Sequence, residues 1–190
     1  MKLKRILPFA RDLLQSAVDK GDIVIDATMG NGHDTLYLAQ LVGEEGHVFA
    51  FDIQNEAIDS TRMQLKKSGI TEGVTLIHRG HEHVKDAVPA DVHGNVKGAI
   101  FNLGYLPGGD KRIVTTANTT IQAVESLLSI MSPEGVIVLV IYHGHDEGKE
   151  ERDKLLTYVE NLDQKMAHVL RYQFINQQNH PPFIVAIEKR

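Results

Sequence analysis

The stretch DIVIDATMGNGHDT, residues 22–35, decides the fold of this chain. Its first part, 22–28, is apolar at nearly every interior position, which predicts a parallel strand covered on both faces. Gly30 and Gly32 predict a tight turn after this strand, because glycine lacks a Cβ atom and accepts positive φ, so that the backbone can approach a ligand closely. A helix is expected from about 33 to 41. Open parallel sheets bind ligands at the carboxyl ends of their strands, so this turn is the expected ligand site.

The rest of the chain alternates short apolar runs with helical patterns, which predicts an α/β fold with a mostly parallel sheet and helices on both faces. Helices are expected over 6–20, 55–68, 81–87, 114–131 and 147–162, and further strands over 47–53, 74–79, 97–103, 135–142, 169–175 and 183–188. The last two strands are close enough in sequence to form an antiparallel hairpin joined by residues 176–182. No internal repeat or linker is found, so a single domain spanning residues 1–190 is expected.

The composition excludes several classes of protein. No apolar run approaches the roughly 20 residues that a membrane span needs, so no membrane partner is expected. With no cysteine, the chain has no disulfide framework, thiolate metal site or cysteine nucleophile. The basic N-terminus is not followed by a secretory apolar core and cleavage site, so we expect a cytoplasmic protein.

The charge balance gives no global attraction to nucleic acid, because 20 Lys and Arg residues face 25 Asp and Glu residues, a net charge of −5. Any contact with RNA must therefore be local. The candidate basic patch consists of Lys2, Lys4, Arg5 and Arg11, to which Lys111 and Arg112 could add. A solvated helix start explains the N-terminal charges equally well.

Two acids flank the glycine turn. Asp26, at the end of the first strand, could accept a hydrogen bond from the ammonium of a bound amino-acid group, and its charge would repel a phosphate. Asp52 ends the next strand, about 20 residues further on, where an acid can bind both ribose hydroxyls of a nucleoside. Gly30 and Gly32 are followed by neither the third glycine of a dinucleotide loop nor the G-K-[ST] of a phosphate loop. The pattern favours an adenosine cofactor, with a simple turn and a helix N-cap at Asp52 as the alternatives.

At this point the sequence resembles a known family. The segments DATMGNGHDT, FAFDIQ, NLGYLPGGD and NQQNHPPF together are similar to the YtqB/MnmM family of methyltransferases, once described as rRNA methylases, and the likeness covers essentially the whole chain. The resemblance implies a Rossmann-like class I methyltransferase fold with seven strands and S-adenosylmethionine as cofactor. It also implies methylation of the exocyclic amine of 5-aminomethyl-(2-thio)uridine at the tRNA wobble position, in the anticodon stem-loop, and it makes a homodimer an expectation.

The resemblance extends the cofactor site beyond the glycine turn. It implies cofactor contacts from Asn31, Asp34, Asp52, Gln54, His81 and Glu82, and with Asp26, Met29, Gly30, Gly32 and Asn102 these residues make up the expected cofactor site. His78, His81 and His83 are close enough in sequence to suggest a metal cluster. They lack an obvious pattern for a third ligand, so no metal is expected.

The acceptor side is expected around Asn102. The loop that begins there resembles the Asn-Pro-Pro-Tyr loop of amine methyltransferases, in which the asparagine carbonyl accepts an N–H of the amine and aims its lone pair. Leu103 and Gly104 replace the two prolines, and the aromatic residue is kept as Tyr105, which could stack on a base. We predict Asn102, Tyr105, Tyr142 and His143 as the catalytic, substrate-side residues.

Several roles stay open on the acceptor side. No single general base is predicted, because Asp146 also suits a helix N-cap and His145 a surface loop. Asn176, Asn179 and His180 could shape the acceptor pocket or a subunit contact, or form a stiff turn. The alternatives in function are an rRNA base methyltransferase, a small-molecule amine methyltransferase and a module that has kept the fold for binding alone.

Overall fold

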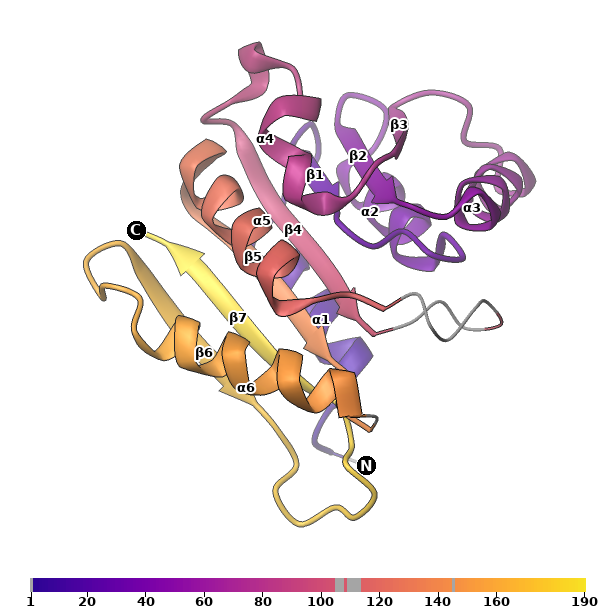
Figure 1. Ribbon diagram of the computed structural model, residues 1–190. Helices are drawn as coiled ribbons and strands as arrows, with labels where there is room; N and C mark the ends of the chain where they lie inside the picture. Colours follow the sequence, from indigo (N-terminus) through magenta and orange to yellow (C-terminus); the bar gives the residue numbers. More distant parts are fainter. Residues whose placement is uncertain (1, 105–107, 109–113, 145) are drawn as a thin grey trace.

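The strand that the sequence places first, β1 (Ile23–Asp26), lies near the middle of the sheet in the computed structural model (Figure 1). The structure describes residues 2–104, 108, 114–144 and 146–190. Among these residues, seven strands form one sheet in the order β3-β2-β1-β4-β5-β7-β6. The other strands are β2 (His47–Asp52), β3 (Val74–His78), β4 (Val96–Leu103), β5 (Met131–Ile141), β6 (Ala167–Tyr172) and β7 (Phe183–Lys189). The α-helices are α1 (Ile6–Ala17), α2 (His33–Val42), α3 (Asn55–Lys67), α4 (Val84–Ala87), α5 (Ala117–Ile130) and α6 (Asp146–Glu160), with 3₁₀ turns η1 (His81–His83) and η2 (Ala90–Val92).

The order of the strands creates a switch point beside β1. The chain runs from β1 outward to β2 and β3, and then returns to place β4 on the other side of β1. All of these neighbours pair in parallel, whereas β7 pairs antiparallel with both β5 and β6. Adjacent loops therefore diverge at the carboxyl ends of β1 and β4, which opens a crevice there. The mostly parallel sheet with an antiparallel C-terminal hairpin is confirmed.

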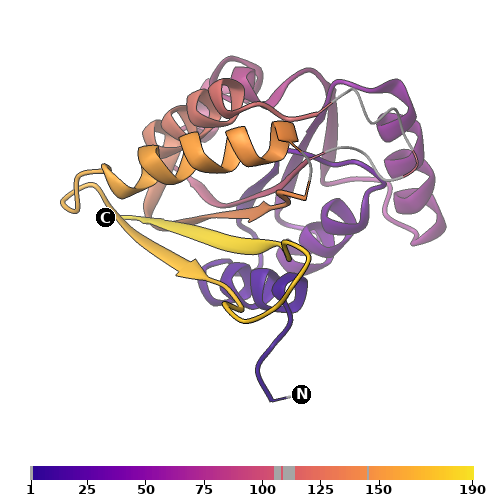
Figure 2. The same cartoon turned by 60° about the horizontal axis from the view of Figure 1, so that its bottom comes forward.

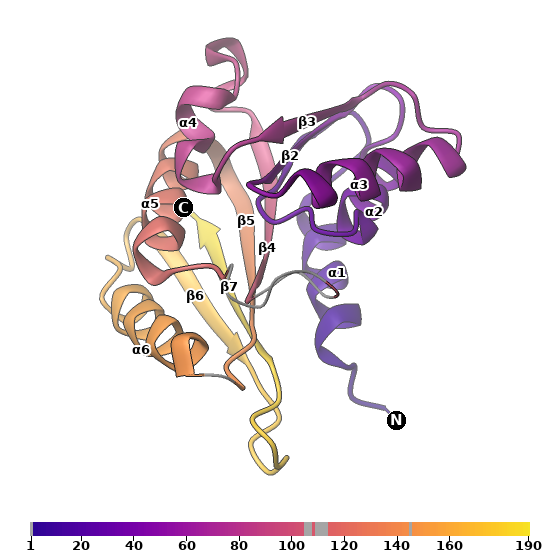
Figure 3. The same cartoon turned by 45° about the vertical axis from the view of Figure 1, so that its right-hand side comes forward.

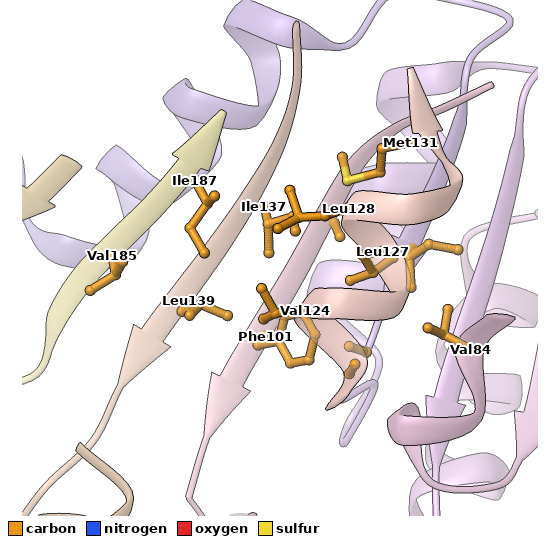
Figure 4. Packing of buried hydrophobic residues seen from close by; sticks show 14 of the residues in the cluster. Val84, Phe101, Val124, Leu127, Leu128, Met131, Ile137, Leu139, Val185 and Ile187 are labelled. Atoms are coloured by element: carbon orange, nitrogen blue, oxygen red, sulfur yellow. The ribbon is translucent and has the colours of Figure 1, made fainter. Parts of the chain in front are cut away.

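The helices form one layer on each face of the sheet (Figure 3). Along β1, Val24 packs in the core under α1, α2 and α3, and its neighbour Ile25 packs in the core under α4, α5 and α6. Both side chains are fully buried, as expected where successive side chains of a strand point to opposite covered faces. In Figure 4, Val124 and Leu127 of α5 point toward Phe101 of β4. The all-apolar interior of DIVIDAT follows from this double cover.

Some element boundaries differ from the prediction. α1 ends at Ala17 rather than at residue 20, because Val18 takes an extended conformation and is buried against Gly98. α5 begins at Ala117, since the hydroxyl of Thr116 accepts the Thr119 N–H as an N-cap.

The prediction that β5 begins only after Ser132-Pro133 is wrong. Met131 already pairs with Val96, and the register then shifts before Val136 pairs with Gly98. Glu134, with φ of 63°, lies in this irregularity. A proline therefore stands inside the strand because the register shift relieves it of a ladder hydrogen bond.

The C-terminal hairpin lies beside α1 (Figure 2). The hydroxyl of Tyr172 donates to the carbonyl of Lys4 at 2.8 Å, and the rings of Phe9 and Tyr172 lie 4.1 Å apart. β6 ends at Tyr172, three residues earlier than predicted, and the connection to β7 spans residues 173–182. In the part of the chain that the structure describes, no helix is long and apolar enough to cross a membrane.

Candidate active site

A cavity of about 1240 Å³ opens at the carboxyl ends of β1, β2, β4 and β5, at the switch point. This volume exceeds the ~300–1,000 Å³ typical of a pocket for one small ligand, so a cofactor and an acceptor group fit together. Its wall includes these predicted site residues: Met29, Gly30, Asn31, Asp34, Asp52, Gln54, His81, Glu82, Asn102, Tyr142 and His143. The structure therefore brings together most of the residues that the sequence singled out.

The turn after β1 is tied to the end of β2. Gly30 has a φ of 49°, and its N–H donates to Oδ2 of Asp52 at 3.1 Å. The other oxygen of Asp52 accepts the backbone N–H of Gln54 at 3.0 Å. Each carboxylate oxygen keeps a second lone pair, so Asp52 can still accept hydrogen bonds from a ligand. The two signals read from the sequence, the glycine turn and the acid, are thus parts of one connected structure.

Gly32 is not among the residues that line the cavity, and its predicted cofactor contact stays a prediction. Its φ is 81°, and a Cβ atom at this position would lie 2.8 Å from the Cα of Thr61 in α3. Glycine is required here because α2 begins close against α3.

Asp26 is also absent from the cavity wall, so the structure does not support a direct contact with a bound ammonium. Its side chain is fully buried; one oxygen accepts the Thr35 hydroxyl at 2.6 Å and the other the Thr28 N–H at 3.2 Å. Burial, reinforced by the charge of nearby Asp34, raises the pKa of Asp26 to about 7. Asp26 thus stabilises the turn after β1 from inside the protein, through its hydrogen bonds to Thr28 and Thr35.

The pH dependence of stability tests this role of Asp26. Its folded pKa, about 7, lies above the ordinary value of 3.8, so between these values the folded state binds more protons than the unfolded state. The contribution of Asp26 to stability is therefore full below pH 3.8, falls as the pH rises toward 7, and changes no further above it. We therefore expect the free energy of unfolding of Asp26→Asn, measured relative to the wild type, to increase by about 3 kcal/mol when the pH is raised from 5 to 8. Urea unfolding at both pH values measures this difference, and an equal effect at both would contradict a buried, protonated Asp26.

His81 supplies an acceptor without a partner. Its Nδ1–H donates to the carbonyl of Ala27 at 3.2 Å, so the neutral ring carries a lone pair on Nε2. Nε2 is buried and has no hydrogen-bond partner among the described residues. Burial lowers the pKa of His81, which keeps the ring neutral. A buried acceptor on the wall of a cavity fits a ligand that donates a hydrogen bond, and with Asp52 it fits an adenosine cofactor.

Asn102, near the end of β4, is fixed by two hydrogen bonds. Its backbone N–H donates to the hydroxyl of Thr28 at 2.7 Å, and its side-chain Nδ2 donates to Oδ2 of Asp34 at 2.8 Å. Oδ1 of Asp34 accepts two N–H groups of Arg11, from Nε at 3.1 Å and from Nη2 at 2.8 Å. The amide of Asn102 therefore has its nitrogen engaged and its carbonyl oxygen still able to accept.

Tyr142 and His143 follow β5 on the acceptor side. Burial, with the charge of Asp34 adding to it, raises the pKa of Tyr142, so its hydroxyl stays protonated. His143 donates from Nε2 to the Pro181 carbonyl at 3.0 Å, and its Nδ1 lies 3.3 Å from Nη1 of Arg152. Burial and the nearby cations lower the pKa of His143. Because both ring nitrogens are engaged, His143 is a poor candidate for a proton acceptor.

Most of this chain matches a known protein family. Residues 48–188 match the sequence model of a family described as "Putative rRNA methylase". The chain belongs to this family.

Three relatives of this methylase illustrate the likeness. A "tRNA (mnm(5)s(2)U34)-methyltransferase, chloroplastic" of Arabidopsis thaliana is 35% identical over 98% of this chain and 70% of its own length. A "putative rRNA-methylase" structure from Clostridium thermocellum is 44% identical, covers all of both chains and has a TM-score of 0.96. A "putative methyltransferase" from Streptococcus mutans, in complex with SAH, is 39% identical over 99% of both chains, with a TM-score of 0.89. The predicted family, class I methyltransferase fold, enzyme class and S-adenosylmethionine cofactor are confirmed, while the contacts of individual residues stay predictions.

The other residues that the sequence singled out in the methylase have different outcomes. Tyr105, His145, Lys111 and Arg112 are outside the described residues. The proposed N-terminal basic patch is weakened, because Lys4 pairs with Asp12 and Arg11 pairs with Asp34. His180 lines the cavity, whereas Asn176 and Asn179 do not.

The three histidines near β3 turn to separate partners. Nε2 of His78 contacts the Ile53 carbonyl at 2.9 Å, and Nε2 of His83 lies 3.7 Å from Glu82. Among the described residues, no group of three or more His, Asp or Glu side chains is arranged to hold a metal ion.

Sequence reasoning missed Arg11 in the cavity wall and the buried acid Glu151, which is not among the wall residues. Arg11 lines the cavity from α1, and only its position in the basic patch drew attention to it. Glu151 is 3% exposed and accepts the hydroxyls of Thr115 at 2.7 Å and Thr120 at 2.9 Å, which ties α6 to the start of α5. No signal separated Glu151 from the exposed charges around it in α6.

Proposed function

We propose that this methylase transfers the methyl group of S-adenosylmethionine to the exocyclic amine of 5-aminomethyl-(2-thio)uridine at the wobble position of tRNA, giving 5-methylaminomethyl-(2-thio)uridine. The observation that carries the proposal is Asn102, an amide with its nitrogen engaged and its carbonyl able to accept, on the wall of a cavity large enough for cofactor and acceptor. A carbonyl acceptor suits an amine, which has N–H groups to donate. The 35% identical relative named as a methyltransferase of this nucleoside supports the choice of substrate.

The cofactor half of the cavity is assigned to the turn after β1 and the loops after β2 and β3. S-adenosylmethionine supplies an electrophilic methyl group when bound. Asp52 accepts the ribose hydroxyls through its remaining lone pairs, and Nε2 of His81 accepts one further hydrogen bond. Gly30 lets the backbone approach the ligand closely.

The acceptor half must deliver an amine without its extra proton. An alkylamine resembles lysine, whose ordinary pKa is about 10.4, so it enters largely protonated. Burial in the cavity lowers the pKa of the amine, since desolvation disfavours the charged form. The carbonyl of Asn102 then accepts one N–H and leaves the lone pair directed at the methyl group. Because His143 has both nitrogens engaged, the proton leaves to water in this proposal.

A methyltransferase of an rRNA base is the second candidate, and the description of the family favours it. Such a base amine is conjugated with its ring and carries no extra proton, whereas the alkylamine must be desolvated. The two candidates therefore differ in the expected pH dependence. A rate that rises with pH as the amine loses its proton is expected for the alkylamine only.

Nucleoside mass spectrometry of a strain that lacks the gene tests the proposal. We expect 5-aminomethyl-(2-thio)uridine to accumulate in tRNA and its methylated form to disappear. The purified protein with S-adenosylmethionine should then restore the methyl group on that tRNA. Unchanged tRNA together with a lost rRNA methyl group would instead identify the second candidate.

A further inference from the structure

The carboxylate of Asp34 bridges two side chains on the acceptor side of the cavity. Its Oδ1 accepts both Nε–H and Nη2–H of Arg11, and its Oδ2 accepts Nδ2–H of Asn102 at 2.8 Å. Only 14% of the Asp34 side chain is exposed, so its carboxylate is largely shielded from water, whereas 40% of the Arg11 side chain is exposed. Charge-assisted hydrogen bonds of this kind are short and directional.

The bridge decides which way the Asn102 amide faces. An ionised carboxylate can only accept hydrogen bonds, so it selects the nitrogen of the amide and turns the oxygen away. The backbone of Asn102 is fixed separately, through its N–H to the Thr28 hydroxyl at 2.7 Å. A side chain anchored at both ends presents its carbonyl in one orientation before any substrate arrives.

Arg11 is itself held in place. Its guanidinium carbon lies 4.8 Å from the centre of the Tyr37 ring, and its carbonyl accepts the Tyr37 hydroxyl at 3.0 Å. A stacked arginine with two N–H groups on one oxygen loses little freedom when it holds a carboxylate. Helix α1 is thereby linked to the acceptor side of the site.

We infer that Arg11 and Asp34 are positioning residues for the acceptor amine, acting through Asn102. This inference rests on the proposed transfer to an amine, and it gives Asp34 a different task from the cofactor contact implied by the family resemblance. The arrangement also selects the substrate. A fixed carbonyl oxygen can accept a hydrogen bond from a substrate with an N–H group, whereas a substrate that presents an ether or carbonyl oxygen there has no hydrogen to donate.

Asp34→Asn tests the inference with a change of almost no volume. The new amide has one oxygen for two partners, and the charged Arg11 is expected to take it. The new NH₂ group then faces Asn102 and favours a flipped amide, with a donor where the amine needs an acceptor. We expect kcat to fall about 100-fold. The affinity for S-adenosylmethionine should stay within about threefold, because no interaction proposed for the cofactor is removed.

A second variant and a matched control complete the test. Arg11→Met removes the anchor but keeps the carboxylate, so kcat is expected to fall about tenfold, and the double variant should lose less than the product of the two. Asp12→Asn is the control, since Asp12 is an acid of α1 whose ion-pair partner among the described residues is the exposed Lys4, and it is not among the residues that line the cavity. Its kcat should equal that of the wild type.

Two functional measurements could overturn the inference, and the orientation of the Asn102 amide gives a third test. The first is a loss of cofactor affinity in Asp34→Asn that matches the loss of kcat, which would make Asp34 a cofactor ligand. The second is a shifted midpoint in the pH profile of kcat rather than a uniform decrease, which would make Asp34 a proton acceptor. Neutron diffraction, which distinguishes the oxygen and nitrogen of Asn102, reads its orientation in both proteins without any turnover. A wild type inactive on the aminomethyl tRNA would therefore contradict the proposed function alone, and an amide that is not flipped in Asp34→Asn would contradict this inference alone.

Discussion

Asn102→Ala is expected to lower kcat by about 100- to 1,000-fold, because the amine then has no fixed acceptor beside the methyl group. The carbonyl acts on the attacking nitrogen, so its removal should raise the barrier of the chemical step more than it weakens binding. Single-turnover kinetics with saturating S-adenosylmethionine and tRNA from the deletion strain measure this step directly.

Calorimetry separates this effect from a loss of cofactor. The affinity of Asn102→Ala for S-adenosylmethionine should remain within about threefold of the wild type. Asn161→Ala serves as the control, because Asn161 is exposed just after α6 and, within the part of the chain that the structure describes, its side-chain amide donates to the carbonyl of Thr157. Parallel losses of kcat and cofactor affinity would move Asn102 into the cofactor site and leave the acceptor without its proposed guide.

The sequence predicts the architecture well because positions that are buried in the fold must be apolar. Val24 and Ile25 face opposite layers of helices, and both must be apolar, so β1 is recognisable without any coordinates. The turn at Gly30 and the acid at Asp52 are recognisable for a similar reason, since each is placed by the end of a strand. Predictions tied to strand ends therefore identified much of the cavity wall.

What the sequence could not supply is the direction in which a side chain points. Asp26 and Asp34 both flank the glycine turn, yet Asp26 points into the protein and Asp34 into the cavity. Arg11 lies on another element, and its pairing with Asp34 depends on how α1 packs, which the periodicity of one helix does not determine. At Gly32 the sequence does not separate two reasons for glycine, because a turn that approaches a ligand and a turn that approaches α3 both require this residue.

Asp52→Ala is expected to reduce the affinity for S-adenosylmethionine by about 100-fold or more, the largest effect on binding that we predict. Hydrogen bonds to a charged group contribute about 1.5–3 kcal/mol each, and the proposal assigns two ribose hydroxyls to this carboxylate. The same substitution frees the N–H of Gly30, which now donates to Oδ2 at 3.1 Å. The turn that lets the backbone approach the ligand is then no longer held, so both losses act in the same direction. Titration calorimetry with S-adenosylmethionine measures the change.

Two further variants separate the ligand contact from the support of the turn. Asp52→Asn keeps one acceptor oxygen, which can hold either Gly30 or a ribose hydroxyl but not both as well as the carboxylate does, so an intermediate loss of affinity is expected. Asp59→Ala removes an exposed acid of α3 that pairs with Arg62, and should bind the cofactor like the wild type. If Asp52→Ala bound S-adenosylmethionine within threefold of the wild type, Asp52 would be a structural acid of the turn, and the cofactor would have to be held mainly by Gly30, His81 and their neighbours. The result that ties the acid to the ligand is a graded loss of affinity, from wild type to Asp52→Asn to Asp52→Ala, that exceeds what the accompanying loss of stability explains, because a role confined to holding the turn would lower stability and affinity together.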